Sequence, residues 1–275
     1  MRFINNRASI DLTVYHRSSK DQILEQDLDP ATGFQVKTIN AGRLTNKGIE
    51  LAMGYAVVKN KNITWQLDGN FTLNRSKVSE MPEEITQIVL AGFTNRGTIA
   101  KNGYPLGMIY GSYIPREAKT GDRIVDQATG YYQVSPDSKV IGDPNPEYRI
   151  VGISTLTVKG VSLRMQWDYT KGGQMYAVTP QILVARGVTK DTDFDRTLSF
   201  IYPGVDPAGN KNKIQLPASG AFFDASLIAD EQYIYDATVV RLRELSLSYS
   251  IPQTALQKLP FGSVSLTVSG TNLFY

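Results

Sequence analysis

The sequence contains no cysteine and only one histidine, His16, among its 275 residues. The absence of cysteine excludes disulfide bonds and metal sites built from thiolates. One histidine without any cysteine makes neither a histidine-based metal centre nor a Ser-His catalytic pair credible. We therefore expect no metal, no cofactor and no catalysed reaction, and we interpret His16 as a residue at the rim of a strand.

Long apolar runs and a strong net charge are also missing. No apolar run approaches the ~20 residues of a transmembrane helix, although a β-barrel, with its weaker signal for each strand, is not excluded. The net charge is only +3, with lysine and arginine spread along the chain, so nucleic acid is not expected as a partner. The opening residues MRFINNR contain no apolar segment. We therefore expect no signal peptide, and if the protein is exported, the chain is expected to be a fragment.

What the sequence does contain is strict alternation of apolar and polar residues. From Leu245 to Ile251, apolar residues alternate with three serines, which is the pattern of a strand with one apolar and one polar face. Arg241, Arg243 and Glu244 precede this alternation, so the strand is expected to begin in water. Similar patterns predict further strands at Ser9–Arg17, Asn46–Val58, Ile63–Asn74, Arg149–Val158, Val161–Tyr169 and Ser263–Ser269. In the second of these, Ile49, Leu51, Met53, Tyr55 and Val57 are expected to share the apolar face.

The lengths of the connections indicate how these strands are arranged. Short connections at Asn60–Asn62, Lys159-Gly160 and Gln253–Gly262 alternate with long irregular stretches at Ser76–Asn145 and Gly172–Asp236. Loops longer than ~15 residues are uncommon in compact domains. Short turns at one rim and long loops at the other are typical of an outer-membrane barrel.

The distribution of charge agrees with a lipid-facing surface. The apolar faces of the strands at Asn46–Val58, Ile63–Asn74 and Val161–Tyr169 carry no charge, whereas their opposite faces carry Glu50, Asp68, Arg164 and Asp168. An Arg or Lys facing lipid would cost ~2–4 kcal/mol at the midplane, while a lumen tolerates charge. Aromatic residues lie near strand ends, as in the aromatic girdles of membrane proteins, at Trp65, Trp167, Tyr169 and Tyr249. The predicted fold is all-β, a partial antiparallel transmembrane β-barrel of about seven strands with long extracellular loops.

Several motifs follow one another in a familiar order: NNRASIDLTVYHRSSKDQIL, NKGIEL, GYPLGMIYGSY, IGDPNPEYRIVG, VRLRELSLSYSIP and SGTNLF. Over nearly the whole chain they resemble the C-terminal barrel portion of SusC/RagA-type TonB-linked transporters. The resemblance implies the bacterial outer membrane, with its lipid around the barrel. It also implies an N-terminal plug, a segment that contacts the TonB complex, and a SusD-like surface lipoprotein that closes over the barrel. The implied function is import of oligosaccharides or peptides.

The resemblance covers residues 1–275 as one part of a barrel. The plug and the TonB-contacting segment are absent from this sequence, and family members continue beyond NLF, so truncation at both ends is expected. Two alternatives stay open: a soluble β-sandwich that binds carbohydrate, and a passive barrel or adhesin without TonB coupling.

Aromatic residues in the long loops are the candidate substrate contacts. Flat rings near carboxylates and arginine suit sugar rings, through stacking and hydrogen bonds to hydroxyls. The candidates are Tyr131, Tyr132, Tyr176, Arg196, Tyr202, Phe222 and Phe223. Because long loops need internal packing, most of these rings are expected to be structural and one or two to contact substrate.

Two further motifs favour structural interpretations. In IGDPNPEY, Pro144 and Pro146 preset a rigid turn where a loop rejoins the barrel. Asp191, Asp193 and Asp195 have the spacing that begins a calcium loop. However, Arg196 replaces the required glycine and Tyr202 stands where the bidentate glutamate should be, so we interpret the segment as a solvated acidic loop.

Overall fold

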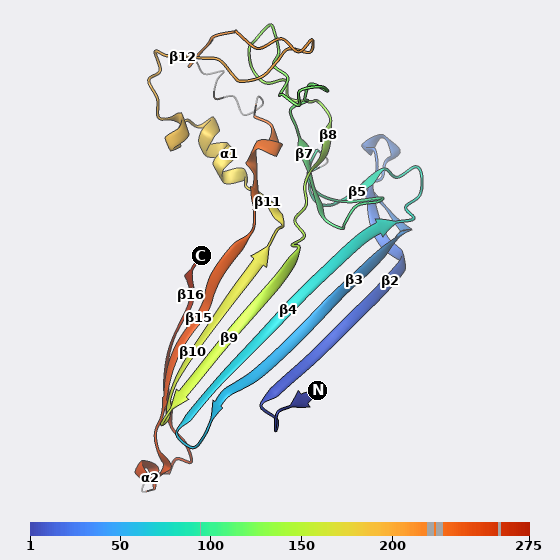
Figure 1. Cartoon of the computed structure of the whole chain (residues 1–275). Coiled ribbons are helices and arrows are strands. Elements are labelled where there is room, and N and C mark those ends of the chain that lie inside the picture. The colour runs from blue at the N-terminus through green and yellow to red at the C-terminus, as the bar shows by residue number, and fades with distance from the viewer. Residues whose placement is uncertain (94, 219–222, 224–227, 258–259) are drawn as a thin grey trace.

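The computed structural model describes the chain except for residues 94, 219–222, 224–227 and 258–259. Its main feature is one layer of long antiparallel strands with folded loops above it (Figure 1). In the described part of the chain, no helix has the length and apolar character needed to cross a membrane.

Eight strands form this sheet in the order β1-β2-β3-β4-β9-β10-β15-β16. They are β1 (Arg2–Phe3), β2 (Ala8–Asp27), β3 (Val36–Lys59), β4 (Ile63–Ser79), β9 (Tyr148–Val158), β10 (Val161–Lys171), β15 (Val239–Ser250) and β16 (Ser265–Phe274). Seven long strands were predicted and all seven are present, so the all-β antiparallel prediction is confirmed. The sheet remains open, because β1 and β16 are its two edges.

The connections separate into two rims, as predicted. The turn rim carries the short connections β3–β4, β9–β10 and β15–β16, the last with the short helix α2 (Gln253–Leu256) (Figure 1). The loop rim carries the β2–β3 connection, with the 3-10 turn η1 (Pro30–Thr32), and the two long connections β4–β9 and β10–β15. Strands β2 and β3 also extend much further toward the loop rim than the alternation predicted, since β2 continues from Arg17 to Asp27.

The long connections are folded, which corrects their description as irregular. The first contains a four-stranded sheet of β5 (Gln87–Phe93), β6 (Arg96–Lys101), β7 (Met108–Ser112) and β8 (Ser138–Gly142). The second contains β11 (Gln174–Tyr176), α1 (Val178–Ala185), η2 (Lys190–Thr192), β12 (Ser199–Phe200), β13 (Leu216–Pro217), η5 (Asp230–Tyr233) and β14 (Ile234–Asp236). Their pairings are β11 with β14 and β12 with β13.

The buried core of the chain belongs mainly to these loops. One cluster joins Val78 and Met81, where β4 ends, to the loop residues Ile88 and Ala100. A second cluster joins the two long loops, with the residues Ile114, Val125, Tyr132 and Ala229. The apolar side chains of the long strands are instead exposed, for example Leu67 at 38% and Leu247 at 53%. Within the described residues no second sheet covers that face, which argues against the soluble β-sandwich.

The strand register aligns these exposed residues into one surface, which we call the apolar face. One row of cross-strand partners runs through six strands as Leu12, Leu51, Phe71, Ile150, Tyr169 and Val240. The neighbouring row belongs to the opposite surface, the polar face, and runs as Asp11, Ala52, Asn70, Val151, Asp168 and Arg241. The 11 residues of β10 span about 36 Å, or about 25 Å of height at a 45° tilt, which matches the apolar band of a membrane barrel.

Polar groups on the apolar face have local explanations. Ser154 stands among apolar neighbours because its hydroxyl accepts a hydrogen bond from Trp65 Nε1 at 3.1 Å. Toward the loop rim, the ring centre of Tyr148 lies 5.8 Å from that of Phe71 and 6.0 Å from that of Tyr169. These rings form part of an aromatic girdle at the edge of the apolar band.

Two β-bulges correct the predicted alternation. In β3 the register shifts between Ala56 and Val58, so Val58, and not Val57, is the partner of Trp65. In β15 the register shifts between Leu242 and Glu244, which leaves Arg243 as the extra residue. Strict alternation from Leu242 would place Glu244 on the apolar face, and the bulge instead pairs Glu244 with Gln166 on the polar face. Arg241 and Arg243 therefore lie inside the paired strand, before the segment of strict alternation.

Candidate functional site

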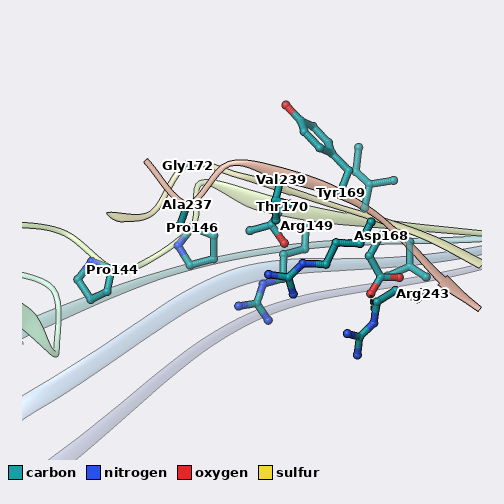
Figure 2. Close-up of a pocket in the computed structure, with 13 residues that line it drawn as sticks. Pro144, Pro146, Arg149, Asp168, Tyr169, Thr170, Gly172, Ala237, Val239 and Arg243 are labelled. Atoms are coloured by element: carbon teal, nitrogen blue, oxygen red, sulfur yellow. Dashed lines mark ion pairs between the residues drawn. The ribbon is translucent and has the colours of Figure 1, made fainter. Parts of the chain in front are cut away.

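The polar face forms a recess where β9, β10 and β15 approach the loop rim. Its volume is about 320 Å³, and three arginines and one aspartate project into it: Arg149, Asp168, Arg241 and Arg243. Figure 2 shows Arg149, Asp168 and Arg243 on the same side of the ribbon, while Tyr169 points to the other side. We call this site the arginine recess.

One acidic group accompanies the three cations of the arginine recess. Asp168 Oδ2 lies 3.1 Å from Arg243 Nε, and Asp168 Oδ1 accepts a hydrogen bond from Gln166 Nε2 at 3.0 Å. Arg243 Nη1 also donates to Asn272 Oδ1 at 2.8 Å. The nearby Arg164 is paired with Glu244 at 3.3 Å and does not line the recess. Arg243 is therefore held in place by β10 and β16.

The other two guanidinium groups are less well neutralised. Arg241 lies 5.5 Å from the ring centre of Tyr275, and its Nε is buried with no hydrogen-bond partner in the described structure. Arg149 is exposed and forms no ion pair with any described carboxylate. The recess thus presents an excess of positive charge, and guanidinium groups bind carboxylates through two parallel hydrogen bonds.

The DPNP turn forms the edge of the arginine recess nearest the loops. Pro144 and Pro146 line the recess, and Asp143 Oδ1 accepts hydrogen bonds from the backbone and side-chain nitrogens of Asn145 at 2.9 and 2.7 Å. Arg75 Nη1 donates to the carbonyl oxygen of Glu147 at 2.8 Å, which ties this turn to β4. The motif therefore fixes where the first long loop rejoins the sheet, as its prolines predicted.

A buried carboxylate, Asp230, joins the two long loops above the recess. Its Oδ2 accepts hydrogen bonds from the backbone nitrogen and hydroxyl of Ser112 at 3.0 and 2.9 Å. Its Oδ1 accepts one from Tyr176 at 3.0 Å and lies 3.4 Å from Arg96 Nη1. Burial opposes the ionised form, but these hydrogen bonds and the Arg96 charge outweigh it and hold the pKa of Asp230 below its ordinary value.

Tyr176, a predicted substrate contact, belongs to this buried network. Its hydroxyl donates to Asp230 and is also hydrogen-bonded to Gln181 of α1. Burial, followed by the nearby Asp230 charge, raises the pKa of Tyr176 to about 12. Its polar end is therefore occupied by structural contacts.

Three of the predicted tyrosines come together in a second group. Tyr132 stacks on Tyr202 with ring centres 4.7 Å apart, and Tyr131 lies 6.1 Å from Tyr202. Tyr132 is 7% exposed, donates to the Pro203 carbonyl oxygen at 3.0 Å, and lies beneath Arg123. Burial raises the pKa of Tyr202 to about 12. These rings lie in the long loops, where Tyr132 and Tyr202 pack in the core cluster that joins them.

Arg196 and Phe223 are also adjacent. The Arg196 guanidinium lies 4.6 Å from the ring centre of Phe223 and 4.7 Å from that of Phe194, so it is sandwiched between two rings. Phe222 lies outside the described residues. Asp195, from the acidic loop, accepts hydrogen bonds from the backbone nitrogen and hydroxyl of Thr197 at 2.9 and 2.7 Å.

Sequence reasoning did not select the arginine recess. The alternation correctly predicts Asp168 on the polar face, but it predicts only a strand that begins in water for Arg241 and Arg243, and it does not single out Arg149. The signal in the sequence is the run Arg-Leu-Arg-Glu at residues 241–244. Regular alternation would turn Glu244 to the apolar face beside Leu242, so the charged residues share the polar face only if the strand contains one extra residue.

Comparison with known proteins finds similarity to TonB-dependent receptors. Residues 1–116 match the family model "TonB dependent receptor-like, beta-barrel". TonB-dependent receptor P3 of Formosa agariphila is 24% identical, and TonB-dependent receptor P26 of the same organism is 23% identical. Each alignment covers 98% of this chain and 28% of the relative, so the chain spans less than a third of these receptors.

Two solved structures also match nearly the whole of this chain. The structure of the RagAB peptide transporter matches with a TM-score of 0.66, and the RagAB peptide importer in its closed-closed state with 0.68. Both are 19% identical and cover 98% of this chain and 30% of the matched chain. At 19% sequence identity, this similarity shows the fold of the chain alone.

Proposed function

We propose that this chain, which belongs to the TonB-dependent receptors of the bacterial outer membrane, forms one wall of an importer for oligomeric nutrients. Residues 1–275 would supply the C-terminal part of the barrel. The apolar face would contact lipid, and the polar face would line the lumen through which solute passes. The observation that carries this proposal is the uncharged apolar row from Leu12 to Val240 beside a row that contains the charged residues Asp11, Asp168 and Arg241.

The loop rim offers a surface for a partner of the importer. Several apolar side chains on and beside α1 are exposed, including Ile182, Leu183 and Val188. Such a surface on the loops would suit a SusD-like lipoprotein that closes over the barrel. Coupling to the TonB complex would depend on a plug and a TonB-contacting segment outside this chain. Oligosaccharides or peptides are the proposed solutes, and no catalytic step is required.

Blocking the lumen in the receptor that contains this chain tests the proposal. Asn70→Cys would place a thiol on the polar face, and the matched Phe71→Cys would place one on the apolar face. Cells would be treated with a bulky impermeant maleimide and then given fluorescent peptides or oligosaccharides. We expect uptake to fall at least about fivefold for labelled Asn70→Cys and to stay unchanged for Phe71→Cys, because only the polar face lines the solute path.

The same assay separates energised import from a passive barrel. Dissipating the proton gradient should abolish uptake, because TonB-linked transport takes its energy from the inner membrane. Uptake that persists would support a passive barrel instead. Undiminished uptake with Asn70→Cys fully labelled would contradict a route along the polar face.

A further inference from the structure

We propose that the arginine recess binds a carboxylate of a short acidic peptide as the peptide enters the lumen. This inference rests on the proposed import function and names a solute class for it. The first support is charge, since three guanidinium groups and one carboxylate, Asp168, line the recess. That carboxylate already forms an ion pair with Arg243 and accepts a hydrogen bond from Gln166. Arg149 and Arg241 therefore remain to bind an external anion.

The second support is the state of Arg241. Its Nε is buried, and no hydrogen-bond acceptor for it lies within the described residues. Because this atom is closed to solvent, an incoming carboxylate would meet the terminal Nη groups of Arg241, which form no ion pair with a described carboxylate. The guanidinium fork offers paired donors whose geometry matches the two oxygens of a carboxylate.

The third support is the position of the recess. It lies where the strands meet the loop rim, and the DPNP turn together with Gly172 and Ala237 forms its edge beside the loops. A solute that enters between the loops meets this site before it reaches the turn rim. The walls contributed by Val151, Val239 and the prolines are aliphatic. The aromatic residue in the lining, Tyr169, points to the other side of the sheet, and Tyr275, which lies beside Arg241, is not part of the lining. Sugar rings are commonly held by aromatic stacking, so this lining favours a peptide over an acidic oligosaccharide.

Arg149 offers the cleanest test, because its side chain forms no ion pair with a described carboxylate whose loss would disturb the fold. The variants are Arg149→Gln, which removes the charge, and Arg149→Lys, which keeps the charge but removes the fork. Lys159→Gln is the control, because it removes one exposed positive charge at the turn rim. The purified receptor that contains this chain would be titrated by calorimetry with a hexapeptide bearing two aspartates, with its asparagine counterpart, and with tetragalacturonate.

We expect the aspartate peptide to bind at least about tenfold more tightly than the asparagine peptide, as one charge-assisted hydrogen bond provides. Arg149→Gln should weaken binding of the aspartate peptide about tenfold, and Arg149→Lys should weaken it less. Lys159→Gln should leave the affinity for this peptide unchanged. Equal affinity for the two peptides, or tighter binding of tetragalacturonate than of the aspartate peptide, would overturn the inference. Uptake of fluorescent peptides by cells would be measured in parallel. Normal uptake without discrimination contradicts only the recess assignment, whereas no uptake of any oligomer contradicts the import function itself.

Discussion

At the scale of single residues, Asp230 holds the loop layer together. It is the point at which β7 of the first long loop and β11 of the second are joined, through Ser112 and Tyr176. Gly111 is required beside it, because a Cβ there would lie 2.9 Å from Asp230 Oδ2. No sequence pattern announces this contact, since Ser112 and Asp230 are 118 residues apart.

Asp230→Asn should loosen the loops and remove a pH dependence. The lowered pKa means that Asp230 stabilises the loops above its ordinary pKa of 3.8, and that this stabilisation is lost as pH falls through the folded value. In the wild type, hydrogen exchange of β7 and α1 should therefore accelerate in acid below about pH 4. The variant should exchange faster already at neutral pH, with about 1–3 kcal/mol lost from the local opening free energy. Asp122→Asn, at an exposed loop position, is the control; a variant with wild-type protection at both pH values would contradict this role for Asp230.

At the scale of elements, β15 shows how much the alternation predicted and where it failed. The faces of Leu245–Ser250 were read correctly, because the pleat fixes side-chain direction from each residue to the next. The bulge at Arg243 before them was not predicted, because an inserted residue leaves no signal in the composition. The two long loops were likewise missed as structure, since their short strands are defined by partners distant in the chain and not by local periodicity.

Deletion of Arg243 tests the bulge. Without this residue, Leu242, Glu244 and Leu245 would follow each other in regular alternation, and every apolar residue of β15 would keep its face. We expect the barrel to assemble and to keep its heat-modifiable migration on gels. Deletion of Ser246 from the same strand is the matched control; it should reduce assembly at least about tenfold, because half of the strand would then turn its serines toward lipid. Equal damage from both deletions would show that Arg243 is not an extra residue.

At the scale of the whole molecule, the chain is a curved wall with two different surfaces and two different rims (Figure 1). The sequence predicted the wall, the separation of its two faces and its loop rim, because parity and connection length are local properties. It did not predict the arginine recess, which requires the register of three strands and the bulge to be known together. On this wall, we propose, the apolar face contacts lipid while the polar face lines the lumen.

Neighbouring residues of opposite parity test that claim most directly. Leu67→Cys and Asp68→Cys, prepared separately in the receptor that contains this chain and labelled with a small fluorophore, would be reconstituted in bilayers. This sequence contributes no competing cysteine. Lipids with a nitroxide on the acyl chain should quench the label at position 67 strongly and that at 68 weakly, whereas aqueous iodide should do the reverse. Stronger lipid quenching at position 68 than at 67 would contradict the assignment of the two faces.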